Sequence, residues 1–228
     1  MATAAIIGFL VVGAAATQTV SPFNAIQNSG PVDIEVRVDP DANRAYEIEL
    51  DAPDKIRDLV LLDVANETLS VEYKKQRWGS WSTNDKAVLR VTVKQLTKVV
   101  LRGSGDLRVE GKQGGPLALS SSGSGNADIG GETGDLQVVI RGSGDIRVEE
   151  LNADSVQVDI KGSGDLDLAG RATDVSIQVY GSGDVDGGRL EARDAEIKVN
   201  GSGDITICAS GDVRRQAHGS GDIVVDCD

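Results

Sequence analysis

The chain has 228 residues, enough for one domain or two small ones, and it carries a formal net charge of −13. This acidic balance argues against nucleic acid, which needs a basic stripe to neutralise phosphates, and against anionic membrane surfaces. It is compatible with divalent cations, basic partners or solubility alone. Hydrophobic residues make up 39% of the chain but aromatic residues only 3%, which predicts a thin aliphatic core.

Residues 1–16 are small and apolar. A short hydrophobic run, Ile6 to Val12, is followed by Ala14-Ala15-Ala16, as in a secretory signal peptide with its cleavage site. No Lys or Arg precedes the run, so a truncated start and a buried first strand stay open as alternatives. We expect a protein that is secreted, periplasmic or on the cell surface, with no membrane span in its mature chain.

The pattern of residues 17–95 predicts strands, but these residues contain no repeated motif. Apolar and polar residues alternate over 32–38, 46–50 and 68–73, with prolines marking turns between them. We expect irregular leading coils of the rod that follows, and a separate small β domain is the alternative. Trp78 and Trp81 lie in a polar, basic loop, where they are candidates for binding a sugar ring or a protein partner. The alternative is that these tryptophans cover the open side of the rod.

Residues 96–228 are organised by one repeated motif, Gly-Ser-Gly-Asp. It begins at Gly103, Gly142, Gly162, Gly181, Gly201 and Gly219, and the near copy Gly-Ser-Gly-Asn at Gly123 fills the one gap. Period-2 alternation flanks each copy, so each repeat predicts a strand, a tight turn, a strand and a second turn. The glycines suit a turn that needs positive φ or has crowded backbone.

Stacking these repeats pairs each strand in parallel with its copy, about 4.8 Å away. A left-handed β-helix would need a six-residue subperiod and coils of three hexapeptides each, and the sequence has neither. We therefore predict an all-β fold, a right-handed single-stranded parallel β-helix with coils of about 19–20 residues.

A family resemblance follows from the opening segments together with the repeats. Phe23-Asn24-Ala25-Ile26, Gly30-Pro31-Val32-Asp33-Ile34-Glu35-Val36, Thr68-Leu69-Ser70-Val71 and the motif ladder resemble the bacterial family called putative autotransporter adhesin, head GIN domain. The resemblance implies a β-helix similar to pectate-lyase-like rods and an exported protein without established enzymatic activity. It offers no catalytic residues to transfer.

The aspartates of the motif form the sharpest candidate site. In register they would lie about 5 Å apart and repel one another, so something must offset their charge. Arg102, Arg141 and Lys161, each just before a motif, or hydrogen bonds from turn amides would do so. The other explanation is Ca²⁺, expected at Asp184, Asp204 and Asp222, because no basic Arg or Lys precedes those three motifs. We favour a purely structural role for these aspartates in the turns. Apart from Ca²⁺ we expect no cofactor.

Cys208 and Cys227 are separated in the sequence by nearly one coil. This spacing places them on neighbouring final coils, and in an exported protein we expect a disulfide between them. His218 is the only histidine, which excludes multi-histidine metal sites.

These observations predict a non-enzymatic, exported structural or adhesin-like module. Its repetitive surface would bind a glycan or a surface protein, and its rod ends make self-association an open expectation. One alternative is a pectate-lyase-like enzyme acting on polysaccharide. Against it, the candidate charged residues repeat along the rod, whereas an active site usually occurs at one place only. The other alternative is a Ca²⁺-stabilised binding roll.

Overall fold

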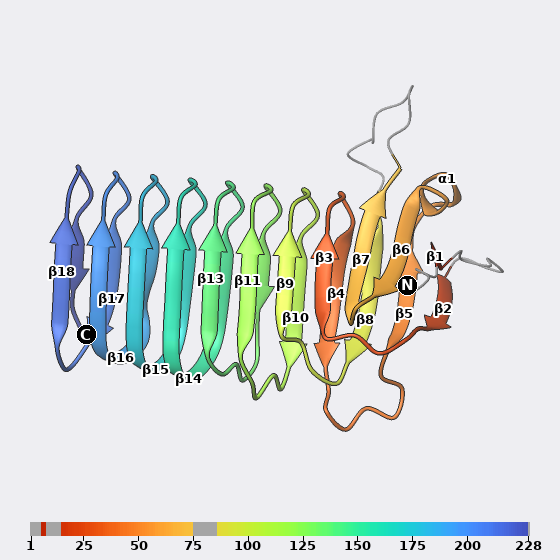
Figure 1. Ribbon diagram of the computed structural model, residues 1–228, viewed down its shortest axis with the longest axis horizontal. Coiled ribbons are helices and arrows are strands. Elements are labelled where there is room, and N and C mark those ends of the chain that lie inside the picture. Colours follow the sequence, from red (N-terminus) through yellow and green to blue (C-terminus); the bar gives the residue numbers. More distant parts are fainter. Residues whose placement is uncertain (1–5, 8–14, 75–85, 228) are drawn as a thin grey trace.

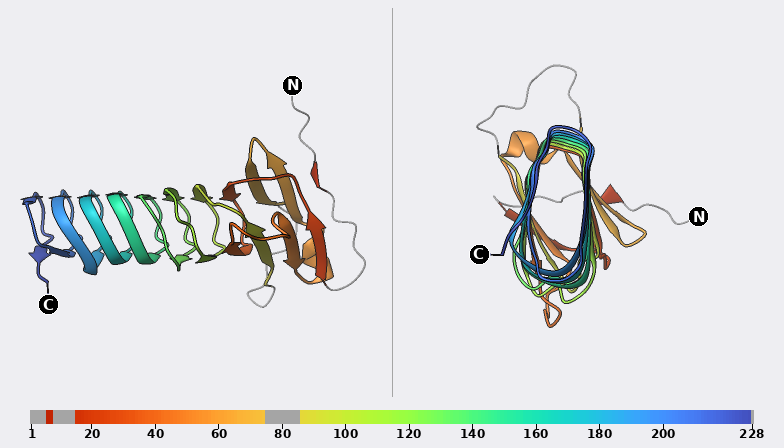
Figure 2. Two further views of the ribbon diagram at one scale, coloured as in Figure 1. Left: turned by 90° about the horizontal axis from the view of Figure 1, so that it is seen from below. Right: turned by 90° about the vertical axis from the view of Figure 1, so that its left-hand side faces the viewer.

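The protein is an elongated rod in which coil stacks on coil (Figures 1 and 2). The computed structural model describes residues 6–7, 15–74 and 86–227. The described strands form one continuous sheet of 19 strands, which winds around the rod axis. Viewed along that axis, the coils superpose as a flattened oval (Figure 2).

The regular part of the rod consists of two stacks of parallel strands joined by the motif turns. One stack, before each turn, contains β9 (Lys98–Leu101), β11 (Leu117–Ser121), β13 (Leu136–Ile140), the second parts of β14 (Ile146–Ile160), β15 (Leu166–Val179) and β16 (Val185–Val199), and β18 (Val213–Ala217). The other, after each turn, contains β10 (Leu107–Gly111), β12 (Ala127–Ile129), the first parts of β14 to β16, β17 (Ile205–Ala209) and β19 (Ile223–Val225).

The register of these strands confirms the predicted parallel β-helix. Ile146 pairs with Leu166 in the following coil, and Leu166 pairs in turn with Val185, again one coil further on. Seen from its carboxyl-terminal end, the chain winds counter-clockwise as it approaches the viewer, so the β-helix is right-handed (Figures 1 and 2). We call the edge made by the Gly-Ser-Gly-Asp turns the motif edge, and the opposite one the basal edge.

The first coils do not stack in chain order. β3 (Ala25–Asn28) lies between β7 (Thr68–Tyr73) and β9. On the other side, β4 (Asp33–Val38) lies between β8 (Val88–Val93) and β10. The coil that comes first in the sequence is therefore inserted between the coil made by β7 and β8 and the first coil of the regular repeats.

Antiparallel strands cover the amino-terminal end of the rod (Figure 1). β5 (Glu47–Asp51) pairs antiparallel with β8, and β6 (Val60–Ala65) pairs antiparallel with β7. The short strands β2 (Ala15–Thr19) and β1 (Ile6–Ile7) add to β5 and β6, and the one-turn helix α1 (Asp54–Arg57) connects those two. The irregular half thus combines two parallel coils with an antiparallel cap, which period-2 alternation alone does not distinguish.

The core is a single aliphatic cluster that runs through both the cap and the repeats. Alternation places every second side chain inside, so that columns such as Val138, Val158 and Ile177 are buried in register. Among the buried polar side chains, Asn28 and Ser121 lie in one column, on either side of Leu101. Asn28 is buried and donates to the Val32 carbonyl at 2.7 Å, whereas the hydroxyl of the fully buried Ser121 has no hydrogen-bond partner among the described residues.

Close stacking of the backbone explains the glycines of the motif. A Cβ on Gly103 would lie 1.9 Å from the Gly30 carbonyl oxygen, and one on Gly164 would lie 2.2 Å from that of Gly144. Among the motif glycines only Gly219 has a positive φ. Of the two reasons that the sequence left open, crowded backbone therefore holds along the motif edge.

Candidate binding surfaces

The motif aspartates form a hydrogen-bonded ladder between coils. In every member except the last, one side-chain oxygen accepts a hydrogen bond from the backbone amide of the equivalent residue in the next coil, at 2.8 to 3.0 Å. The ladder runs through Asp33, Asp106, Asn126, Asp145, Asp165, Asp184, Asp204 and Asp222. We expected hydrogen bonds from amides as one way to offset the repulsion between the aspartates. The donor amide, however, belongs to the neighbouring coil and not to the same turn.

The basic residues before the motif do not neutralise this ladder by direct pairing. In the described part of the chain, Arg102 and Arg141 make no ion pair with any carboxylate, and Lys161 pairs with Asp159 at 2.8 Å instead. Lys161 also lies 5.7 Å from the ring centroid of Tyr180 in the next coil. The expected local neutralisation is therefore replaced by hydrogen bonding to amides.

Asp184, Asp204 and Asp222 lie in successive coils of the ladder. One oxygen of Asp184 and one of Asp204 are occupied by the next coil's amide. Across residues 6–7, 15–74 and 86–227, no group of three or more His, Cys, Asp or Glu side chains is arranged to hold a metal ion. Calcium binding at these aspartates stays a prediction.

A second column, which sequence reasoning missed, carries alternating charges on the outer face of the strands after the motif. In spatial order it contains Arg90, Glu35, Arg108, Asp128, Arg147 and Asp167. Arg90 pairs with Glu35 at 3.0 Å and Arg147 with Asp167 at 3.2 Å. Together with the aspartate ladder this column lines a shallow groove of about 740 Å³. Cross-strand pairs of this kind stabilise the stack of coils.

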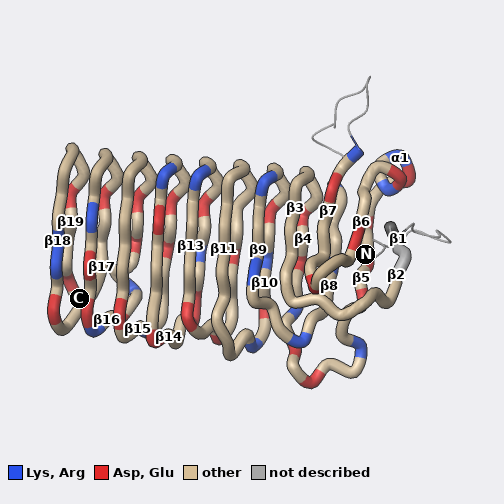
Figure 3. Tube along the Cα trace, viewed as in Figure 1, with Lys and Arg blue, Asp and Glu red and all other residues tan. Residues whose placement is uncertain are grey.

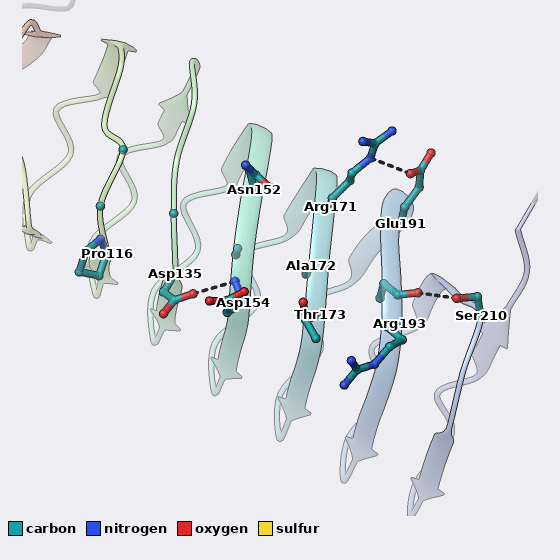
Figure 4. Close-up of a pocket in the computed structure, with 15 residues that line it drawn as sticks. Pro116, Asp135, Asn152, Asp154, Arg171, Ala172, Thr173, Glu191, Arg193 and Ser210 are labelled. Carbon is teal, nitrogen blue, oxygen red and sulfur yellow. Dashed lines mark hydrogen bonds and ion pairs between the residues drawn. The ribbon is translucent and has the colours of Figure 1, made fainter.

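A polar groove of about 670 Å³ runs along the basal edge (Figure 4). Six successive coils contribute to it, so it follows the rod axis. Ala153, Ala172 and Ala192 are paired in register and buried beneath it. Because these side chains are small, the surface is hollowed there. We call this feature the basal groove.

The walls of the basal groove alternate hydrogen-bond donors and acceptors. Asn152, Arg171 and Glu191 form one in-register column, in which Arg171 donates to Glu191 at 3.0 Å (Figure 4). On the other side, Asp135 accepts hydrogen bonds from two backbone amides of the next coil, both at 2.9 Å. The in-register spacing of these polar residues in the sequence was the available signal for this groove.

Arg193, in the wall of the basal groove, pairs with two in-register aspartates, Asp174 and Asp194. Its side chain donates to Asp194 at 2.8 Å and lies 3.5 Å from Asp174. The Asp194 carboxylate also accepts the backbone amide of Asp212 at 2.8 Å. The Asp212 amide and, after it, the Arg193 guanidinium lower the pKa of the Asp194 carboxyl, because both stabilise its ionised form.

The cysteines and the histidine lie at the carboxyl-terminal end of the rod. Cys208 and Cys227 form a disulfide that joins the last two coils, with Cα atoms 4.5 Å apart. His218 is exposed on the final motif turn. Trp78 and Trp81 lie outside the described residues. Among the described segments no helix has the length and apolar character needed to cross a membrane.

The fold and its columns define the class of protein: a right-handed parallel β-helix whose outer faces carry polar residues in register. Residues 22–228 match the family described as "Putative auto-transporter adhesin, head GIN domain". The chain belongs to this family, as the motifs suggested.

Solved structures share the fold over nearly the whole length. A structure titled "putative adhesin" from Parabacteroides distasonis has a TM-score of 0.74 at 17% identity, covering 93% of this chain and 96% of that one. A second, also titled "putative adhesin", from Parabacteroides merdae has a TM-score of 0.74 at 20% identity, covering 93% and 95%. A third from Parabacteroides distasonis, titled "Putative lipid binding protein", has a TM-score of 0.74 at 20% identity, covering 93% and 96%. No curated protein matches the chain.

Proposed function

We propose that this chain is a non-enzymatic, exported, adhesin-like module whose basal groove binds an extended glycan. The observation that carries the proposal is the construction of the groove from equivalent positions of six successive coils. A ligand that repeats along its own axis meets similar groups in each coil, so weak polar contacts add up along the rod. The adhesin description of the family agrees with this role and with a location outside the cell.

The chemistry of the groove favours a glycan. Its walls offer amide, guanidinium, carboxylate and hydroxyl groups from Asn152, Arg171, Glu191 and Thr173, which suit the many hydroxyls of a sugar chain.

Binding to a glycan microarray tests the proposal, with the full chain as the probe. The groove variant combines Arg171→Ala with Glu191→Ala, which removes an ion pair of 3.0 Å and leaves the net charge unchanged. The matched control combines Arg147→Ala with Asp167→Ala, an inter-coil pair of 3.2 Å on the charged column. We expect the groove variant to weaken binding about tenfold, equivalent to about 1.4 kcal/mol, and the control to bind as the wild type does.

Two results would overturn the proposal. Equal binding by the wild type and the groove variant would place the ligand elsewhere on the rod. Release of new reducing or unsaturated ends from a bound polysaccharide would favour the alternative of a pectate-lyase-like enzyme.

A further inference from the structure

A line of basic and aromatic side chains follows the motif edge on the side opposite the aspartate ladder. We call it the ridge column: Arg102, Ser122, Arg141, Lys161 and Tyr180, the residues that immediately precede five successive motifs. They are in register because the residues before them pair from coil to coil, Leu101 with Ser121, Ser121 with Ile140, Ile140 with Ile160 and Ile160 with Val179. All five are exposed, and Figure 3 shows basic positions at turn tips of the motif edge, with an uncharged tip among them.

The two arginines of the ridge column make no ion pair among the described residues. Arg90, Arg108, Arg147, Arg171, Arg189 and Arg193 each pair with a carboxylate. Within the described chain, Arg102 and Arg141 have no such partner, although a motif aspartate follows each of them closely in the sequence. Their backbones nonetheless belong to the sheet, since the Arg102 amide donates to the backbone carbonyl of Asn28 at 2.8 Å and the Arg141 amide to that of Ser121 at 2.7 Å.

Lys161 and Tyr180 extend the column with an aromatic platform. Tyr180 is 46% exposed, and Val224 is the other large hydrophobic side chain exposed in the described chain. The Tyr180 hydroxyl donates to Gln178 at 2.9 Å, and Lys161 lies 5.7 Å from the ring centroid. These contacts hold the ring beside Lys161, where it presents apolar surface of the kind that packs against a sugar ring.

We propose that the ridge column is a second binding site, which takes an acidic polysaccharide whose uronate carboxylates lie along the rod axis. At a coil spacing of about 4.8 Å, Arg102 and Arg141 are about 10 Å apart and Lys161 follows about 5 Å further on. Guanidinium groups bind carboxylates through paired hydrogen bonds. The site lies at the edge opposite the basal groove and is independent of it.

The aspartate ladder lies at the same edge of the rod and disfavours a densely charged polyanion. A nucleic acid carries one charge about every 1.7 Å of its axis. It would therefore be repelled by the ladder, whereas a uronate polymer carries at most one carboxylate per sugar. The three cations of the ridge column are spread over four coils, which matches a sparsely charged chain.

The experiment measures binding of the full chain to immobilised polygalacturonate by biolayer interferometry, with neutral dextran as the second surface. The ridge variant combines Arg102→Gln, Arg141→Gln and Lys161→Gln. The matched control combines Lys98→Gln, Arg108→Gln and Arg147→Gln, the same change of charge elsewhere on the rod. We expect the ridge variant to weaken polygalacturonate binding by about tenfold or more, and the control by less than about twofold. Wild-type binding should weaken at high salt, which screens exposed charges.

The variant Tyr180→Ala distinguishes the contribution of ring stacking to binding from that of the basic side chains. It should weaken binding about threefold while leaving the dependence of affinity on salt unchanged. Unaltered affinity would remove Tyr180 from the site.

Equal loss in the ridge and control variants, or equal binding to dextran, would overturn the ridge site in favour of unspecific attraction. Failure of the wild type to bind polygalacturonate would overturn it as well. A groove-dependent microarray signal would then still support the proposed function, so the two proposals fail separately. Circular dichroism of each variant establishes that the β-helix is intact.

Discussion

The carboxylate of Asp184 accepts a hydrogen bond from the backbone amide of Asp204, 2.8 Å away in the next coil. The same contact recurs along the motif edge, so the aspartate of each motif holds the following coil rather than its own turn. Asn126 makes the equivalent contact, because its amide oxygen accepts the Asp145 amide at 2.9 Å. The ladder therefore requires an acceptor oxygen at each position and not a negative charge.

This relationship predicts different outcomes for two substitutions at Asp184. Asp184→Asn keeps an acceptor for the Asp204 amide, so the free energy of unfolding should change little. Asp184→Ala removes the acceptor and should cost about 1 kcal/mol, the usual net contribution of one hydrogen bond. Urea unfolding followed by circular dichroism measures both.

The same pair of variants tests calcium. Bound Ca²⁺ would raise the melting temperature of the wild type over a chelator control, with Mg²⁺ as the control for ionic strength. Asp184→Asn would lose part of that rise because it lacks a carboxylate ligand. If Ca²⁺ leaves the melting temperature of the wild type unchanged, Asp184 and Asp204 act only as structural hydrogen-bond acceptors and Asp222 has no metal role.

Gly164 should not tolerate even a methyl group. A Cβ there would lie 2.2 Å from the carbonyl oxygen of Gly144, so Gly164→Ala must push two coils apart and should cost about 3 kcal/mol. Gly130→Ala is the matched control, because its Cβ would meet the nearest atom at 3.7 Å. Similar unfolding free energies for the two variants would contradict this account of the motif glycines.

Ser121 is a weak point in the aliphatic core. It occupies a column between Leu101 and Ile140, and its buried hydroxyl has no hydrogen-bond partner in the part of the chain that the structure describes. Ser121→Val replaces an unsatisfied polar group by an apolar one and should stabilise the fold by about 1 kcal/mol. Ser120→Val, at the partly exposed neighbouring position, should have little effect. Destabilisation by Ser121→Val would show that the column has no room for a branched side chain.

The lowered pKa of Asp194 predicts that the protein loses stability in acid. Its pKa in the folded protein is lowered from the ordinary value of 3.8, so its contribution is complete above that value and disappears as the pH falls through the lower, folded pKa. The melting temperature of the wild type should therefore exceed that of Asp194→Asn at neutral pH, and the difference should shrink below about pH 4. A difference independent of pH would mean that ionisation of Asp194 is not involved.

The disulfide between Cys208 and Cys227 should protect the last coil alone. The two residues are separated by 19 positions, and closing a loop of that size contributes about 3 kcal/mol. In Cys227→Ser, amide hydrogens of β18 and β19 should exchange faster while those of β11 to β15 stay protected, since each coil contacts only its neighbours. Faster exchange along the whole rod would show that the end coil supports the others.

Much of the repeat region was predictable because its contacts join equivalent positions of successive repeats. The inward columns follow directly from alternation once coils of nearly equal length stack in register, as Val138 and Val158 do. The proximity of Cys208 to Cys227 follows from the same arithmetic. The basal groove was harder to see, because its depth depends on the small side chains of Ala153, Ala172 and Ala192 beneath polar neighbours.

By itself the sequence determined the period, the turns and the residues that face the core, since these depend on local alternation and on repetition. Only the tertiary structure decided the order of the first coils. β3 and β4 separate β7 and β8 from the repeats, which brings Arg90 to within 3.0 Å of Glu35 across 55 residues of chain. The antiparallel cap and the inter-coil donor of each motif aspartate are likewise non-local. Pairing between strands that share no repeat depends on which edges are free as the whole chain folds, and no local pattern encodes that choice.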